Sequence, residues 1–223
     1  GVVACRPQDL AVPVREGGLE ALSEEDLWRD VDQFSRGLHD RGPGGQDEEQ
    51  AVERMKQRLQ EMRTLPAFGR DYRSRKGSGP WRICARKEGQ SGRAVVWVAL
   101  DSGTGVKGGA LPRAVLISLA KIWDTYKTPP QALLFCALAA EGGLEDYLAS
   151  PAHPLAETDR LITFGPLGDG ELIRSESSAS GIPVTHFRTP AEDAGTDEDR
   201  MESVDYRKVL PHVRALYHTG LEE

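Results

Sequence analysis

Apolar residues recur along the first third of the chain with the spacing of amphipathic helices. Ser23 is a helix-capping residue followed by three acids, and apolar residues lie three or four positions apart over 22–38. The same spacing resumes over 47–62, after the Gly- and Pro-containing break at 41–45. The pattern predicts a helix on each side of that break, followed by a basic, Gly-rich turn over 70–79.

Continuous apolar runs in the rest of the chain predict buried strands. The run Ala94–Leu100 has no charged residue, as expected for a strand that is covered on both faces. Similar runs predict strands over 81–87, 132–138, 161–164 and 184–187, with helices over 111–126 and 204–218 and a flexible loop over 103–109. This alternation predicts an α/β protein, a three-layer α/β/α sandwich with a mixed, mostly parallel central sheet.

The same pattern predicts the domain organisation and the place of a site. Residues 1–18 are aperiodic and contain Pro and Gly, which suits an N-terminal arm or tether, and residues 19–223 form a single domain. In parallel sheets, sites lie beyond the carboxyl ends of the strands. The loops that follow Leu100, Leu138 and Phe164 are therefore the places to inspect, with the loop after Phe187.

Charge and length exclude two classes of partner. The 223 residues carry a formal charge of −7, with a pI near 5.4, so nucleic acid is excluded as the main partner. The sequence contains no apolar run of the ~20 residues that a membrane-spanning helix needs. Contact with a membrane is therefore expected only through a lipid anchor.

The three cysteines do not have metal-ligand spacing. Cys84 and Cys136 lie inside apolar strand runs, and we expect buried, unpaired side chains there rather than a disulfide or a nucleophile. Cys5 follows Val2-Val3-Ala4, which is similar to the end of a bacterial lipoprotein signal. Two interpretations of Cys5 stay open: a lipid-anchored cysteine of an exported, periplasmic or outer-membrane lipoprotein, or a chance V-V-A-C in an otherwise soluble protein.

Five segments resemble, in order, the motifs of one family. They are RGPGGQDEEQAVERM (41–55), AVVWVALDSGTG (94–105), GVKGGALPRAVLISLAKI (105–122), LLFCALAAEGGL (133–144), and GIPV (181–184) with GTDEDRMESVDYRKVL (195–210). Together they resemble the M28-type zinc aminopeptidases over about residue 23 to the end. The resemblance implies the same sandwich fold.

The resemblance also implies which positions would carry the family's chemistry. That chemistry uses two zinc ions about 3.5–4 Å apart, a glutamate as general base, and an aspartate that orients the first histidine ligand. The corresponding positions in this chain are, in order, Ala99 (histidine ligand), Asp101 (orienting aspartate), Gly108 (bridging aspartate), Ala140 (general base), Glu141 (glutamate ligand), Gly165 (acidic ligand) and Gly195 (last histidine). Only Glu141 is retained among the five ligands, and the base is absent.

These losses predict a catalytically degenerate member of the family, without zinc or another cofactor. The predicted function is a protein- or peptide-binding or scaffolding module. Its former cleft is expected to be lined by Asp101 and Glu141, which would attract a free amine.

Two alternatives remain open. One is a divergent metallo-aminopeptidase or hydrolase with a relocated or single-metal site, which needs Glu141, His186 and either Asp169 or Asp193 to converge. The other is a structural lipoprotein whose acidic loop, including Glu198 and Asp199, docks a partner. The basic patch formed by Arg70, Arg73, Arg75 and Lys76 is expected to be a loop, or a contact to anionic headgroups if Cys5 is lipidated.

Overall fold

The computed structural model describes residues 18–124, 128–196 and 198–222. Residues 1–17, nearly all of the expected arm, lie outside the described residues, and so does Cys5. None of the described helices is long and apolar enough to span a bilayer. The prediction of a lipid anchor at Cys5 therefore stays a prediction.

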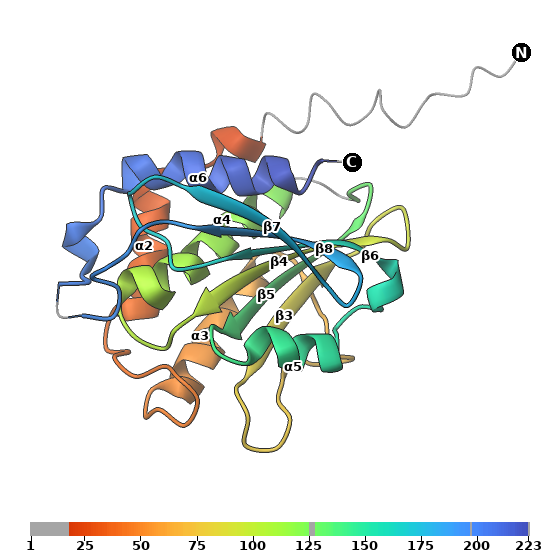
Figure 1. The fold of residues 1–223 in the computed structure, drawn as a ribbon, viewed down its shortest axis with the longest axis horizontal. Coiled ribbons are helices and arrows are strands. Elements are labelled where there is room, and N and C mark those ends of the chain that lie inside the picture. Colours follow the sequence, from red (N-terminus) through yellow and green to blue (C-terminus); the bar gives the residue numbers. More distant parts are fainter. Residues whose placement is uncertain (1–17, 125–127, 197, 223) are drawn as a thin grey trace, which may run out of the picture.

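One mixed sheet forms the centre of the fold (Figure 1). Its strands run in the order β1-β3-β5-β4-β6-β8-β7, with β2 paired to β3. The central strands β5, β4, β6 and β8 are parallel, whereas β1, β2, β3 and β7 pair antiparallel at the two sides. The strand bounds are β1 Leu65–Pro66, β2 Arg73–Ser74, β3 Arg82–Lys87, β4 Ala94–Asp101, β5 Ala132–Ala139, β6 Thr158–Phe164, β7 Ile173–Ala179 and β8 Ile182–Arg188.

Helices cover the two faces of the sheet unequally. The bounds of the helices are α2 Glu24–Ser35, α3 Glu48–Glu61, α4 Leu111–Asp124, α5 Gly143–Ala149 and α6 Tyr206–Thr219. Along β4, Val95, Trp97 and Ala99 pack with α2, α3, α4 and α6, whereas Val96 and Val98 pack on the side of α5. Because a strand buries alternate residues on opposite faces, this arrangement confirms the predicted three-layer sandwich.

Aromatic rings join the closing helix to the sheet. Trp97 stacks on Phe135 of the neighbouring strand, with ring centres 5.6 Å apart, and the Trp97 indole N–H donates a hydrogen bond to the Leu216 carbonyl at 3.1 Å. Gly220 follows α6 against the same indole, and a Cβ at that position would lie 2.1 Å from it. Glycine is therefore required where the chain leaves α6.

Most predicted elements are present, with instructive differences. Ser23 caps α2, its side chain accepting from the Asp26 N–H at 3.1 Å. The segment expected as a flexible loop instead contains a π-helical turn, Val106–Ala110, directly before α4. Strand β7 was not predicted, because its exposed Ser- and Glu-containing sequence at the sheet edge has no apolar run. The short helix α5 was also missed.

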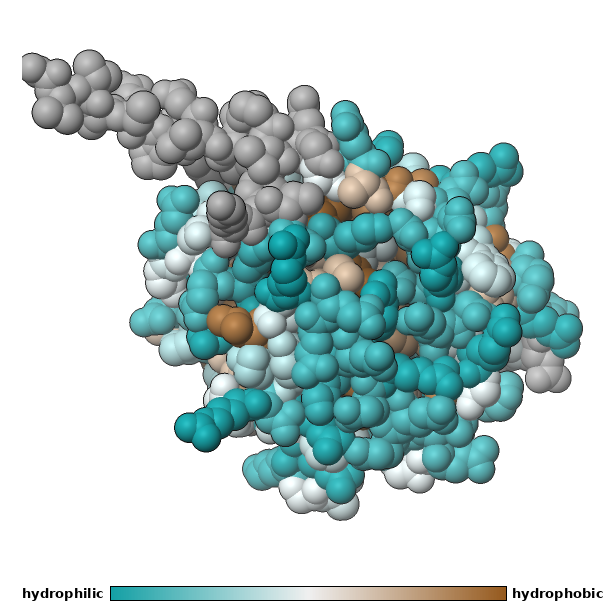
Figure 2. Space-filling view, turned by 180° about the vertical axis from the view of Figure 1, so that it is seen from behind, coloured by the Kyte–Doolittle hydropathy of each residue, from teal (hydrophilic) through white to brown (hydrophobic). Residues whose placement is uncertain are grey.

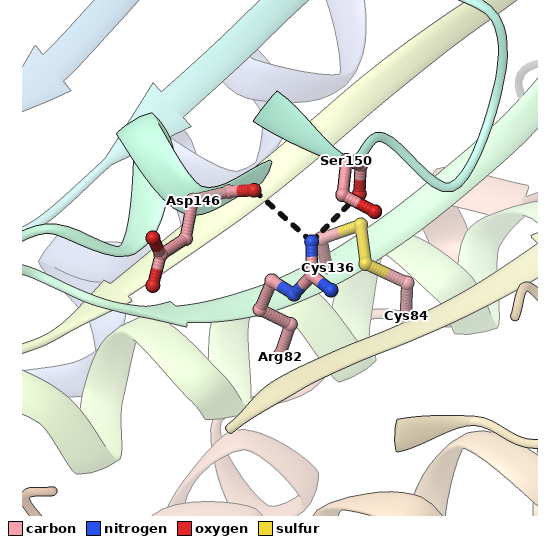
Figure 3. Close-up of a disulfide and its surroundings, with 5 residues drawn as sticks. All are labelled: Arg82, Cys84, Cys136, Asp146 and Ser150. Carbon is pink, nitrogen blue, oxygen red and sulfur yellow. Dashed lines mark hydrogen bonds between the residues drawn. A yellow bond between two sulfur atoms is a disulfide. The ribbon is translucent and has the colours of Figure 1, made fainter. Parts of the chain in front are cut away.

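A disulfide joins Cys84 to Cys136, which corrects the expectation of two unpaired thiols (Figure 3). Antiparallel pairing of β3 with β5 places the two residues opposite each other, with Cα atoms 4.2 Å apart. Arg82, two residues away, donates hydrogen bonds to the Asp146 and Ser150 carbonyls at 3.0 and 2.6 Å, which ties α5 to the same strand. Pairing was missed because the register of two strands 52 residues apart cannot be read from their composition.

Candidate functional site

The fold brings most of the predicted positions to one edge of the sheet, but in different environments. Ala99 is fully buried in the apolar layer beneath that edge. Asp101 ends β4, whereas Ala140 and Glu141 follow β5 at the surface. Gly165 is buried directly after β6. Gly195 lies in the loop beyond β8, so the four parallel central strands present these loops on a common side.

Asp101 is the centre of a buried ionic cluster. Its Oδ2 accepts a hydrogen bond from Arg113 Nε at 2.6 Å, and both carboxylate oxygens accept from Arg41 at 3.4 Å. The Gly103 N–H donates to Oδ1 at 2.7 Å. We call Arg41, Asp101 and Arg113 the Asp101 cluster. It joins the loop after α2, the end of β4 and the start of α4.

The cluster holds Asp101 ionised. Burial alone would raise the pKa of this carboxyl, but the Arg113 and Arg41 charges and the Gly103 N–H outweigh burial, and the pKa lies below its ordinary value. Because two guanidinium groups already surround the carboxylate, Asp101 is not available to a ligand's amine. The expectation that it would attract one is corrected here.

Asp199 organises the loop beyond β8. Its side chain is buried and accepts hydrogen bonds from the backbone N–H groups of Lys107 and Gly195, each at 2.8 Å. A buried carboxylate whose two oxygens already accept these hydrogen bonds is not exposed to dock a partner. Of the two residues expected in a docking loop, only Glu198 is exposed.

Lys107 directly precedes Gly108, the position that the sequence resemblance predicts for the bridging aspartate. Its ammonium forms an ion pair with Asp193 at 2.7 Å, and only 12% of the side chain is exposed. The Lys107 carbonyl accepts from the Leu167 N–H at 2.9 Å, and the aliphatic part of the side chain lies against Gly168. A cation of the protein itself therefore joins the loops after β4, β6 and β8.

Close backbone contact leaves no room for a carboxylate at one of the predicted positions. A Cβ on Gly165 would lie 2.7 Å from the Leu100 carbonyl oxygen, and the φ of Gly165 is +133°, which side chains rarely adopt. At Gly108 the nearest atom to a Cβ is the hydroxyl of the exposed Ser102, at 2.5 Å, which can rotate away. Gly165 is therefore closed by the surrounding backbone, whereas Gly108 is not.

These residues do not fit a zinc centre. A structural or catalytic zinc ion needs about three or four N, O or S donors. Asp101 is engaged by two guanidinium groups, and Glu141 is exposed and has no second donor beside it. Within the described residues, no group of three or more His, Cys, Asp or Glu side chains is placed to hold a metal ion.

The residues expected to form a relocated single-metal site do not come together either. His186, on β8, contacts the Thr163 hydroxyl at 2.8 Å, and burial and Arg188 lower the pKa of the imidazole. Asp169 accepts from the Asp205 N–H at 2.9 Å, and Asp193 is paired with Lys107. Each candidate ligand has its own partner, and Glu141 is not joined to any of them.

Sequence reasoning missed both arginines and Lys107. Arg113 is a lone charge in the otherwise apolar segment that becomes α4, and it is 6% exposed. A charged residue in that position needs a buried partner. The lone arginine in an apolar segment therefore indicated a buried ion pair. Asp101, at the end of an apolar strand, was the carboxylate that could form it.

Comparisons with known proteins agree with this architecture. No protein-family model matches the sequence, and no curated protein matches it. Solved structures do match. The Legionella pneumophila aminopeptidase LapA has a TM-score of 0.71 at 10% identity, over 99% of this chain and 76% of that one.

Two further structures match over most of both chains. The Bacillus subtilis zinc aminopeptidase BSAP has a TM-score of 0.69 at 10% identity, with 88% of this chain and 95% of that chain covered. A Bacteroides thetaiotaomicron glutaminyl cyclase also gives 0.69, at 11% identity, with 90% and 98% covered. The chain has the aminopeptidase fold. At such identities the likeness establishes this fold alone, and in this chain the fold carries the Asp101 cluster at the strand ends.

Proposed function

We propose that this protein is a non-catalytic form of the aminopeptidase fold that binds a protein or peptide. The observation that carries the proposal is the Asp101 cluster. Two arginines engage the carboxylate at the end of β4, and the surrounding backbone closes Gly165 to acidic side chains. A site lined by the protein's own cations repels a divalent metal ion.

A matched metal and activity measurement tests the proposal. The protein is purified without chelator, incubated with zinc, desalted and analysed for metal by plasma emission. Melting temperatures with and without EDTA, and assays with aminopeptidase and glutaminyl cyclase substrates, are measured on the same sample. We expect below about 0.1 zinc per chain, no EDTA shift and no turnover. One or two retained zinc ions, or metal-dependent turnover, would overturn the proposal.

The surface favours a polar mode of binding. The face shown in Figure 2 is largely hydrophilic, with apolar residues in small groups. Trp28 and Leu65 are the exposed large apolar side chains of the described residues, 43% and 45% exposed. Small scattered apolar groups do not form the patch typical of an obligate interface. Charged and hydrogen-bonding groups are therefore proposed to select the partner.

We also propose that the domain works in an oxidising compartment, as an exported protein does. The Cys84–Cys136 disulfide supports this, because disulfides persist chiefly outside the reducing cytosol. Lipidation of Cys5 is proposed as the route to a membrane. Metabolic labelling with a fatty acid, compared between the full chain and a Cys5→Ser variant, tests it, and equal labelling of the two would contradict it.

A further inference from the structure

A small hollow lies beside the Asp101 cluster, at the edge of the sheet where β3 begins and β4 and β5 end. Its cavity volume is about 20 Å³, which is room for one small polar group, and it is open to solvent on one side. All three cluster residues line it, together with Trp81 and Glu48. Trp81, and the sides of Arg41 and Arg113 that face the hollow, take no part in the contacts that hold the Asp101 cluster together.

The cluster carries more positive than negative charge. Arg41, Asp101 and Arg113 are 4%, 5% and 6% exposed, so two guanidinium groups share one carboxylate out of contact with bulk water. Among the described residues, no second acid forms an ion pair with either arginine. Burying an unbalanced charge costs free energy unless another partner is supplied. The cluster can therefore accept one more anionic group.

Arg113 also has hydrogen-bond donors that are not used within the described part of the chain. Arg41 donates from Nε and both Nη atoms, to Asp101 and to the Leu38 and Gly105 carbonyls. Arg113 donates from Nε to Asp101 and from Nη1 to the Ala51 carbonyl at 3.2 Å. Its Nη2 group has no hydrogen-bond partner in the described part of the chain. A guanidinium edge with free N–H groups is the preferred partner of a carboxylate.

Trp81, one of the residues that line the hollow, lies against two arginines. The Arg75 guanidinium lies 4.5 Å from the centre of the Trp81 ring, and that of Arg73 lies 4.9 Å from it. Arg73 is paired with acids of α3, whereas Arg75 forms no ion pair with the described residues. Arg75 therefore adds positive charge next to Trp81, and the ring gives the hollow an apolar wall.

One acid lies in the wall. Glu48, at the start of α3, accepts from the Gly44 N–H at 2.8 Å, which holds its carboxylate in place. An anionic ligand in the hollow is repelled by this carboxylate. Glu48 therefore limits affinity, and its charge can be removed without touching the Asp101 cluster.

We propose that this hollow binds a carboxylate carried by a peptide, either its C-terminus or an acidic side chain, through the guanidinium of Arg113. The proposal rests on the peptide-binding function proposed above and names the group that is recognised. On this proposal, the ends of the central strands carry a positive charge that belongs to the protein itself. The Arg113 guanidinium supplies this charge and binds the ligand's carboxylate, but it does not activate a water molecule.

Calorimetric titration at low ionic strength tests the proposal on the full chain. The probes are N-acetyl-trialanine with a free C-terminus, the same peptide as its C-terminal amide, and N-acetyl-Ala-Glu-Ala amide. We expect at least one of the two acids to bind at least tenfold more tightly than the neutral amide, and which acid does so identifies the source of the carboxylate. Equal affinities, or no binding at millimolar peptide, would overturn the proposal.

Variants distinguish this hollow from the rest of the surface. Arg113→Gln is expected to weaken acid binding at least tenfold, and Glu48→Gln to strengthen it severalfold because a like charge is removed. Glu61→Gln makes the same charge change on α3 outside the hollow and is expected to leave affinity unchanged. If Arg113→Gln does not fold, Glu48→Gln still decides: unchanged affinity in that variant rejects the proposal.

The two proposals fail differently. Zinc retention or turnover contradicts the non-catalytic function, whatever the peptide affinities are. Absence of zinc with equal binding of acid and amide peptides leaves the non-catalytic function standing and rejects the carboxylate site alone.

Discussion

Arg113 Nε lies 2.6 Å from Asp101 Oδ2, and this contact joins the first turn of α4 to the end of β4. Both side chains are almost fully buried. The pair lies where the aminopeptidase fold would be expected to carry its chemistry, at the carboxyl ends of the central strands. In this chain the charges there stabilise the edge of the sheet.

Removing the carboxylate should destabilise the fold strongly. Asp101→Asn leaves two buried guanidinium groups without their counter-charge, and we expect a loss of about 3–5 kcal/mol in the free energy of unfolding. Urea unfolding measures it. Glu25→Gln breaks an exposed pair with Arg29 and serves as the control, with an expected loss below about 1 kcal/mol. Similar losses in the two variants would contradict the structural role of the cluster.

Placing acids at the positions expected to correspond to the family's ligands should not create a metal site. Gly165→Asp places a Cβ 2.7 Å from the Leu100 carbonyl at a positive φ, whereas Gly108→Asp meets only the Ser102 hydroxyl, which can rotate away. We expect Gly165→Asp to cost about 1–3 kcal/mol or more, Gly108→Asp to cost less, and neither variant to retain zinc. Ala140→Glu restores the position of the general base on an exposed turn and is the matched control, expected to fold normally. Stoichiometric zinc in Gly108→Asp would show that the loop can reopen.

The strength of the sequence signals explains which parts of the fold could be predicted. Long apolar runs such as Ala94–Leu100 define the central strands, and Ser23 marks the start of α2, because burial and capping are local properties. Strand β7 is an exposed, polar edge and has no such signal. The Cys84–Cys136 bond depends on strand register, which only the folded sheet determines.

The site shows the same division between local and non-local information. The motif resemblance predicts the degenerate positions, and the structure places two of them, Ala99 in the core and Gly165 at the sheet edge, while their correspondence to the family's ligands stays a prediction. It did not show that Asp101 is engaged by Arg41, which lies 60 residues away in sequence. Nor could a run of acids show that Asp199 points inward to two backbone N–H groups, since exposure is decided by packing.

Asp199 and Glu198 should behave oppositely although they are neighbours. Asp199→Asn removes a buried carboxylate that accepts from the backbone N–H groups of Lys107 and Gly195, and we expect a loss of about 1–3 kcal/mol. Glu198→Gln changes an exposed side chain, with an expected effect within about 0.5 kcal/mol. Chemical denaturation of both variants measures the difference. Equal effects would restore the docking-loop interpretation for both residues.

The disulfide should contribute substantially to stability. It closes a loop of 52 residues, for which the chain-entropy relation gives roughly 4 kcal/mol at 25 °C. We expect reductant to lower the urea midpoint of the natural chain and to leave a Cys84→Ala, Cys136→Ala double variant unchanged. Thiol titration of the denatured, unreduced chain should find at most one free thiol among the three cysteines, that of Cys5 where it is not lipidated. Three free thiols in protein from an oxidising compartment would contradict the pairing.

The segment after α6 should respond to acid through Glu222. Its carboxylate accepts from Arg160 at 2.7 Å and from Arg174 at 2.8 Å, and these two partners lower the pKa of Glu222 to about 2. Because the folded pKa lies below the unfolded value, the contribution is complete above the unfolded pKa of about 4.5 and is lost as pH falls toward 2. The difference in unfolding free energy between the natural chain and Glu222→Gln should therefore shrink between pH 5 and pH 2, by a modest amount because the carboxylate is 40% exposed. Direct titration of the Glu222 carboxyl by NMR is the second measurement, and a midpoint near the ordinary glutamate value would show that the two arginines do not hold it.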